Sequence, residues 1–291
     1  MVVLIFLFSL ARFSADKLEI LQGGVRVLQG DVRIEDDGTV IRAENATLYE
    51  REDMAVISDE VKIHTKRADI FTDTAYYYFK EQKTLLKGRV RIHSDSVEIN
   101  TPLVWFFNKE NRAKTDSLIT ITDKKGVRVL GRRGVYDFNK EKGWLYENPK
   151  LIIEKEKVQV TSKEMEIDNR EGVASGIGDV ELKSEKTALR CDTILFYTHK
   201  NTGIALGNPY LLDGDNRVKG DSVCFFIKDN RLESLKISGN VKAIYFTSEG
   251  DRIEIEGGEM GLYFKEERLD RIDITNHSVG VLYRRVDETK R

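Results

Sequence analysis

Residues 30–49 read GDVRIEDDGTVIRAENATLY, and this stretch decides the fold. Apolar side chains alternate with charged or polar ones through Val32 and Ile34, then again from Ile41 to Leu48. The turn residues Asp36-Asp37-Gly38 separate the two runs. Alternation with a period of two is typical of a strand that has one buried and one solvated face. The stretch therefore predicts two consecutive β-strands joined by a turn.

The same opening recurs about every 30 residues along the chain. Later copies of it begin at residues 59–63, 88–92, 148–151, 178–182, 207–211 and 239–243. Two of these copies carry a proline at the same place, Pro149 and Pro209. The spacing predicts about eight two-strand units of roughly 30 residues each.

The second strand of each unit repeats as apolar-x-small-x-x-apolar-x-apolar. Ile41, Ala43, Ala46 and Leu48 give one copy, and the stretch 70–77 gives the next. The two-residue skip inside the pattern indicates a β-bulge that resets which side chains face inward. Because a slip of one residue would turn every side chain to the opposite face, a pattern kept in step over so many copies favours one shared interior.

Composition agrees with a β protein and excludes some partners. The 291 residues include 40% hydrophobic side chains and only 3 prolines. The 47 Lys and Arg nearly balance the 49 Asp and Glu, so the net charge of -2 gives no general attraction to nucleic acid. No segment has sustained helical periodicity and no linker divides the chain, so we expect one domain over residues 16–285 and a charged tail at 286–291.

The N-terminus predicts export from the cytoplasm. Residues 2–8 form an unbroken apolar run, and Ser9-Leu10-Ala11 fits a signal-peptidase site, so residues 1–15 are interpreted as a signal peptide. The run is too short to span a bilayer, and it lacks the basic residues of a good leader. An uncleaved leader that holds the protein at a membrane surface stays an alternative. The expected location is the periplasm.

The repeat predicts an all-β fold. Short strand pairs that each contact only their neighbours should stack into an elongated, twisted open β-jelly roll, a V-shaped sandwich of two sheets. Such a stack leaves unpaired strand edges at its two ends, which invite a partner strand.

The Gly-x-Val-x-Ile openings, the Ala-x-x-Ala-x-Leu-Tyr second strand at residues 43–49 and the leader resemble the OstA-like, or LptA-type, lipopolysaccharide-transport family. The resemblance covers nearly the whole chain after the leader and rests on a diffuse repeat. It implies a periplasmic bridge, not an enzyme, that carries the acyl chains of lipopolysaccharide or a similar glycolipid in an apolar groove and joins like-folded transport proteins or itself by end-to-end strand addition. The chain is longer than the usual soluble bridge component of that family.

From the residues alone, the inward columns predict either a packed core or a lipid groove. The resemblance favours the groove, which would serve lipopolysaccharide transport and outer-membrane assembly. Its walls are expected at Val32, Ile34, Ile41, Ala43, Leu48, Ile70, Ala75, Tyr77, Val90, Ile92, Val97, Val104, Val129, Tyr136, Ile167, Leu189, Ile194, Phe196, Val218, Phe225 and Leu262. The alternative is a structural or adhesive β-repeat surface protein with a filled core and no lipid cargo.

Other chemistry finds little support in the sequence. The four histidines occupy unrelated positions of the repeat, and none has metal-ligand spacing to a cysteine or carboxylate. The two cysteines, Cys191 and Cys224, occupy different columns and are interpreted as strand-embedded thiols. No cofactor, metal or catalytic residue is expected, and no nucleic acid as a partner.

Overall fold

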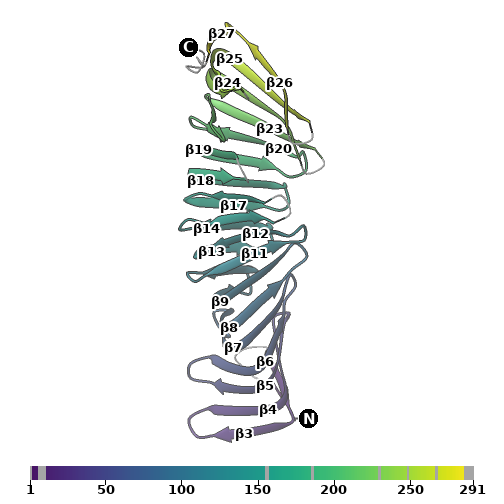
Figure 1. Cartoon of the computed structure of the whole chain (residues 1–291). Coiled ribbons are helices and arrows are strands. Elements are labelled where there is room, and N and C mark those ends of the chain that lie inside the picture. Colours follow the sequence, from purple (N-terminus) through teal and green to yellow (C-terminus); the bar gives the residue numbers. More distant parts are fainter. Residues whose placement is uncertain are drawn as a thin grey trace. The chain divides into compact units, whose positions relative to one another are not determined.

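The structure is a computed structural model that describes residues 2–5, 11–154, 157–184, 187–228, 231–247, 249–265 and 268–284. All the helices and strands assigned within these residues are β-strands, so the all-β prediction is confirmed (Figure 1). No helix in this part of the chain is long and apolar enough to cross a membrane.

The chain divides into two compact units. Unit 1 comprises residues 1–147 and 168–170, and unit 2 comprises residues 148–167 and 171–291. The boundary of the expected single domain at residue 285 and the tail at 286–291 lie outside the described residues. The single domain over residues 16–285 stays a prediction.

The strands of unit 1 are joined in chain order by short turns (Figure 1). They are β1 (Val2–Ile5), β2 (Arg12–Ala15), β3 (Lys17–Leu21), β4 (Val25–Asp36), β5 (Thr39–Tyr49), β6 (Met54–His64), β7 (Asp69–Tyr78), β8 (Lys83–His93), β9 (Val97–Phe107), β10 (Arg112–Thr115), β11 (Ile119–Asp123), β12 (Val127–Gly131), β13 (Arg133–Asp137) and β14 (Lys142–Tyr146).

Unit 2 continues in the same manner. Its strands are β15 (Lys150–Ile153), β16 (Val158–Thr161), β17 (Glu164–Asp168), whose last residue belongs to unit 1, β18 (Val173–Lys183), β19 (Thr187–Tyr197), β20 (Thr202–Leu206), β21 (Tyr210–Asp213), β22 (Asn216–Lys219), β23 (Ser222–Lys228), β24 (Arg231–Phe246), β25 (Arg252–Lys265), β26 (Arg268–Thr275) and β27 (Val279–Tyr283).

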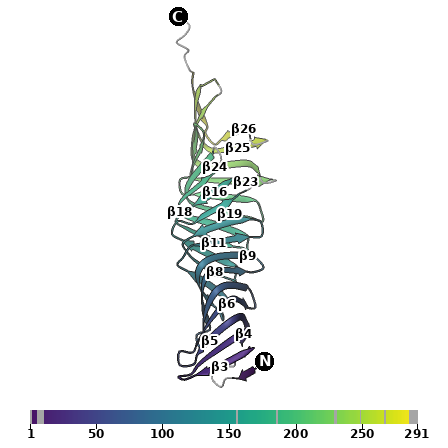
Figure 2. The ribbon, with the colours of Figure 1, turned by 60° about the horizontal axis from the view of Figure 1, so that its bottom comes forward.

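Each long strand takes part in two sheets and bends between them (Figure 2). The first half of β4, residues 25–29, pairs with residues 45–49 of β5, and its second half, 32–36, pairs with 39–43. We call the sheet that contains residues 25–29 sheet 1, and the sheet that contains residues 32–36 sheet 2. The strand pairs from β5 to β9 extend both of these sheets in unit 1, and their inward side chains form the core of this unit.

The corner between the two sheets is a β-bulge, as the two-residue skip predicts. The register shifts between Arg42 and Asn45 in the pairing of β5 with β6, and between Phe71 and Thr74 in the pairing of β7 with β8. The backbone of the opening residues takes positive φ at these corners, as at Gly30-Asp31, Gly178-Asp179, Gly207-Asn208 and Gly239-Asn240. The recurring Gly-Asp and Gly-Asn pairs are therefore corner residues, because glycine, Asn and Asp tolerate this region best.

The small residues of the second strand have a role that the sequence analysis missed. The hydroxyls of Thr101 and Ser162 and the thiol of Cys191 each donate to the carbonyl two residues further on, at 3.1, 2.7 and 3.3 Å. The Thr72 hydroxyl donates to the Lys87 carbonyl of the neighbouring strand at 2.8 Å. These side chains are buried, and the carbonyls they contact lie just past the bulge, where the ladder is interrupted. A short side chain with a donor thus stabilises the corner.

The residues of the expected leader take part in sheet 2. β1 pairs with β2, and β2 pairs with residues 33–35 of β4. Ala11, Phe13 and Ala15 are buried, whereas residues 6–10, which carry most of the expected cleavage site, lie outside the described residues. Export and cleavage of residues 1–15 stay predictions.

Candidate functional site

The interior of unit 1 holds the first fourteen of the side chains expected to line a groove, from Val32 to Tyr136. All of them are buried, with at most 7% of their surface exposed at Ala43. They come from both sheets: Leu48, Ala75, Tyr77, Val104 and Tyr136 from sheet 1, and the others from sheet 2. The inward direction of these side chains is as expected, and their contact with lipid stays a prediction.

Aromatic side chains of sheet 1 close this interior on the side away from the corners. The Tyr77 hydroxyl donates to Asp36 of sheet 2 at 2.8 Å, and the ring of Phe79 packs edge-on against Phe13 of sheet 2 at 5.7 Å between ring centres. Burial raises the pKa of Tyr77, and the Asp36 carboxylate raises it further. Burial also raises the pKa of Asp36, although the Tyr77 hydrogen bond opposes this change.

A second closure lies further along unit 1. The Tyr136 hydroxyl is 3.1 Å from the Ser96 hydroxyl and accepts a hydrogen bond of 3.1 Å from the Asn169 side chain. The Phe106 and Phe138 rings, both buried, lie 5.8 Å apart beside it. The Tyr136–Ser96 contact joins the two sheets, and the inward side chains between them are buried, so the interior of unit 1 is a filled core.

The Tyr77–Asp36 contact gives a testable prediction. Replacing Tyr77 by Phe is expected to lower the free energy of unfolding at pH 7 by about 1–3 kcal/mol, because the buried Asp36 loses its donor. The Asp36 pKa is already raised above 3.8 in the folded state. The stability that protonated Asp36 contributes is therefore complete below pH 3.8 and lost as the pH rises through the raised pKa.

The loss caused by Tyr77→Phe should consequently shrink at acid pH, which urea unfolding at pH 7 and pH 4 would measure. Tyr76→Phe is the matched control, since the Tyr76 ring lies on the outer face beneath the Lys87 ammonium. Equal losses for Tyr77→Phe at both pH values would contradict the assignment of the closure to this contact.

The interior of unit 2 is bordered differently. Leu189, Ile194, Phe225 and Leu262 are buried as expected, but Phe196 and Val218 are only partly buried and pack at the border of the core, and Ile167 is also half-buried. We call the partly buried apolar side chains at this border the apolar rim: Val160, Leu182, Phe196, Val218, Ile227, Leu232, Ile255, Phe264, Ile272 and Ile274.

Among the described residues of unit 2, no hydrogen bond joins a tyrosine to a carboxylate as Tyr77 and Asp36 are joined in unit 1. Phe196 and Phe225 instead stack in parallel, with ring centres 6.1 Å apart and planes 5° apart. The Phe225 ring lies directly over Gly203 of β20, where a Cβ would come within 2.0 Å of it. The rim thus presents hydrocarbon to the solvent.

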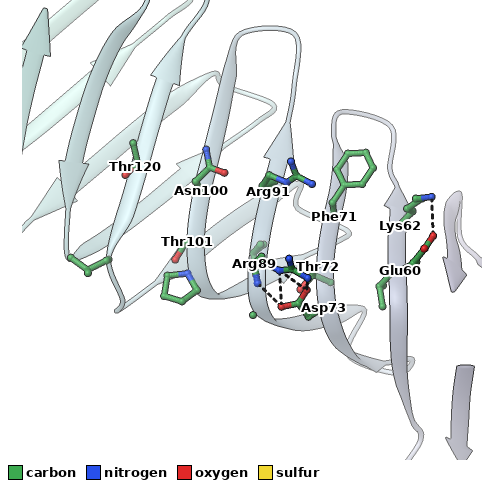
Figure 3. Close-up of a pocket in the computed structure, with 15 residues that line it drawn as sticks. Glu60, Lys62, Phe71, Thr72, Asp73, Arg89, Arg91, Asn100, Thr101 and Thr120 are labelled. Atoms are coloured by element: carbon green, nitrogen blue, oxygen red, sulfur yellow. Dashed lines mark hydrogen bonds and ion pairs between the residues drawn. The ribbon is translucent and has the colours of Figure 1, made fainter. Parts of the chain in front are cut away.

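An open concavity of about 820 Å³ lies on the outer face of unit 1, and the sequence analysis did not predict it (Figure 3). Outward side chains of β6 to β9 and β11 line it, including Lys62, Phe71, Arg91, Asn100 and Thr120. At its corner Arg89 forms an ion pair with Asp73 at 3.0 Å, and this partner lowers the pKa of Asp73. The clue in the sequence was the outward half of the alternation, which was interpreted only as a solvated face.

Cys191 and Cys224 are both free, and burial raises the pKa of the Cys191 thiol to about 11. No group of three or more His, Cys, Asp or Glu in the described residues could hold a metal ion.

Comparison with known proteins finds a likeness among solved structures. No family model matches the chain, and no curated protein does. Among solved structures, a match is the crystal structure of LptH, the LptA homologous periplasmic component of the conserved lipopolysaccharide transport device from Pseudomonas aeruginosa. This match has 15% sequence identity and a TM-score of 0.33, and it covers 35% of this chain and 79% of LptH. The function proposed below therefore rests on the residues and contacts of this chain.

Proposed function

We propose that this chain is a periplasmic lipid-binding bridge protein that shields lipopolysaccharide, or a similar envelope glycolipid, and passes it toward the outer membrane. The apolar rim of unit 2 carries the proposal, because it places partly exposed hydrocarbon beside a buried apolar core. The resemblance of the repeat to the lipopolysaccharide-transport family and the expected leader support the same role.

The energetics favour an apolar site for such a cargo. Exposing an acyl chain to water costs about 0.8 kcal/mol for each CH₂, so the free energy of exposing a chain of a dozen methylenes is roughly 10 kcal/mol. The side chains of the rim are aliphatic or aromatic and offer no polar group that an acyl chain would leave unpaired. Acyl chains that cover the rim would also remove its own apolar surface from water.

The interior of unit 2 is more accessible to the acyl chains of the cargo than the interior of unit 1. In unit 1, the Tyr77–Asp36 hydrogen bond and the contact between the Tyr136 and Ser96 hydroxyls join the two sheets, and a lipid would have to displace both. In unit 2, Phe196, Val218 and Ile255 are already partly exposed. We therefore assign the lipid contacts to unit 2 and a structural role to the interior of unit 1.

Free strand edges support like-folded partners. In unit 2, β27 pairs with β25 alone among the described strands, and its side chains are exposed, Val279 by 62%. In unit 1, β3 likewise pairs only with β4 among the described strands, and Ile20 is exposed by 66%. Apolar edge strands with unpaired backbone groups invite strand addition by a second chain. We propose that like-folded proteins, or other copies of this chain, bind at these edges.

Photocrosslinking in cells tests the lipid assignment. A photoreactive phenylalanine analogue at Phe196 is expected to give lipid adducts, whereas the same residue at Leu48 or Val104, both buried in unit 1, should react only with protein. Leu206 serves as a control on the outer face of β20, because its side chain is exposed but does not border the core.

The outcomes separate the possible sites. Adducts from Leu48 or Val104 would place the lipid in unit 1 and contradict the closure described above. Lipid adducts from none of the interior positions would favour the second candidate function, a structural or adhesive repeat protein without lipid cargo. The filled core of unit 1 is the observation that favours this second candidate.

A further inference from the structure

One row of outward side chains crosses sheet 2 of unit 1 in register. Neighbouring strands place its members directly opposite one another: Arg33 faces Arg42, Arg42 faces Lys62, and Lys62 faces Phe71. The row continues from Phe71 to Arg91, from Arg91 to Asn100 and from Asn100 to Thr120. Figure 3 shows its last five members side by side on adjacent strands. We call these seven residues the basic row.

The charges of the basic row are poorly compensated. Arg33 contacts Glu35 at 2.7 Å and Lys62 lies 3.7 Å from Glu60, but Arg42 and Arg91 have no acidic partner among the described residues. Like charges placed directly opposite each other on adjacent strands destabilise a sheet. Arg42 therefore lies between two other cations without a carboxylate of its own, an arrangement that an added anion would stabilise.

The far half of the row lies in the open concavity of about 820 Å³. The Phe71 ring is partly exposed there, with the Arg91 guanidinium 5.9 Å from the ring centre. The Asn100 amide and the Thr120 hydroxyl follow on the next strands. An aromatic face, an amide, a hydroxyl and cations in one concave row match the needs of a sugar chain that carries negative charge.

We propose that the basic row binds an acidic oligosaccharide, a sugar chain bearing carboxylates or phosphates. Arg42 and Arg91 contact its anionic groups, Phe71 stacks on a sugar ring, and Asn100 and Thr120 hydrogen-bond to hydroxyls. The site lies on the outer face of sheet 2 and shares no residue with the apolar rim, so it does not rest on the lipid function. The ligand is either the saccharide part of a glycolipid or a free acidic glycan.

Titration calorimetry of the full chain with three probes tests the proposal. Hexagalacturonate, a carboxylated oligosaccharide, is expected to bind, and maltohexaose, a neutral one, to bind at least about tenfold more weakly. Inorganic polyphosphate supplies charge without sugar and should also bind more weakly than hexagalacturonate. Raising the salt concentration should weaken the hexagalacturonate complex, because its ion pairs are exposed to solvent.

Substitutions locate the site. Arg42→Gln and Arg91→Gln are each expected to weaken hexagalacturonate binding about tenfold, the usual scale for one charged hydrogen bond. Phe71→Ala should weaken hexagalacturonate binding and leave polyphosphate binding unchanged. Lys114→Gln is the matched control, because Lys114 is an exposed cation on the outer face of sheet 1. Thermal unfolding of each variant checks that the fold is kept.

Two results would overturn the proposal. Polyphosphate binding as tight as hexagalacturonate binding, with no effect of Phe71→Ala, would show a site for charge alone. Hexagalacturonate binding that survives both arginine substitutions, or that falls equally in Lys114→Gln, would place the contact elsewhere. If the natural ligand is the saccharide part of a glycolipid, both the intact glycolipid and its isolated saccharide should compete with hexagalacturonate. If the natural ligand is a free acidic glycan, that glycan should compete and the glycolipid should not.

Discussion

Replacing Val218 by Asp is expected to weaken acyl-chain binding by about a hundredfold or more, because a carboxylate would have to lose its water when the lipid covers it. Val218 lies on β22 in the apolar rim and is partly exposed, so the carboxylate of the variant can reach water in the lipid-free protein. The fold should therefore survive a substitution that the complex does not tolerate.

Titration of the purified chain with a fluorescent twelve-carbon fatty acid measures this effect. Leu206→Asp is the matched control, since it exchanges an exposed apolar side chain on the outer face of β20 for the same carboxylate. We expect the control to bind the probe as the unchanged protein does. Equal binding by Val218→Asp would remove the apolar rim from the lipid site.

Replacing Gly88 by Ala is expected to lower the free energy of unfolding by about 2–4 kcal/mol, for two reasons. Gly88 lies at a corner between the sheets with φ of +100°, a region that residues with a Cβ rarely adopt. An added Cβ would also lie 2.7 Å from the Cβ of Asp73 on the neighbouring strand. Asp73 is held in place because it accepts hydrogen bonds from the backbone and side chain of Arg89, at 3.0 and 3.1 Å.

Gly126→Ala separates the two causes. Gly126 has φ of +85°, but no atom lies within 4 Å of the position of an added Cβ. This control should lose only about 1 kcal/mol, the usual scale of strain at positive φ. Urea unfolding of the two variants measures the difference, which reports the crowding at the corner. Equal losses would mean that Asp73 and Arg89 move aside without cost.

Much of the fold could be predicted from residues close together in the sequence. The alternation from Ile41 to Leu48 gave the strands and their inward face, and the skip between Ala43 and Ala46 gave the bulge, which the register shift between Arg42 and Asn45 confirms. Both follow from the period of two in an extended chain, a property that each segment has by itself. The inward side chains of the candidate groove were identified for the same reason.

The role of the small residues in the second strand of each unit could not be predicted as easily. Thr72 was interpreted only as a small residue of the repeat and Cys191 only as a strand-embedded thiol, whereas their hydroxyl and thiol donate to backbone carbonyls at the corner. The sequence alone could not show this, because the free carbonyl exists only once the ladder is interrupted by the bulge.

The sequence by itself determined that the chain is an all-β repeat and which side chains point inward, since both depend on local alternation. Only the tertiary structure decided where the interior is closed and where its border is open. The closure in unit 1 depends on Tyr77 meeting Asp36 from 41 residues away, and the basic row depends on the register of seven outward residues across neighbouring strands. Contacts between side chains of different repeats are set by how the strands pair and how far apart the two sheets lie, and neither quantity is encoded in any single segment.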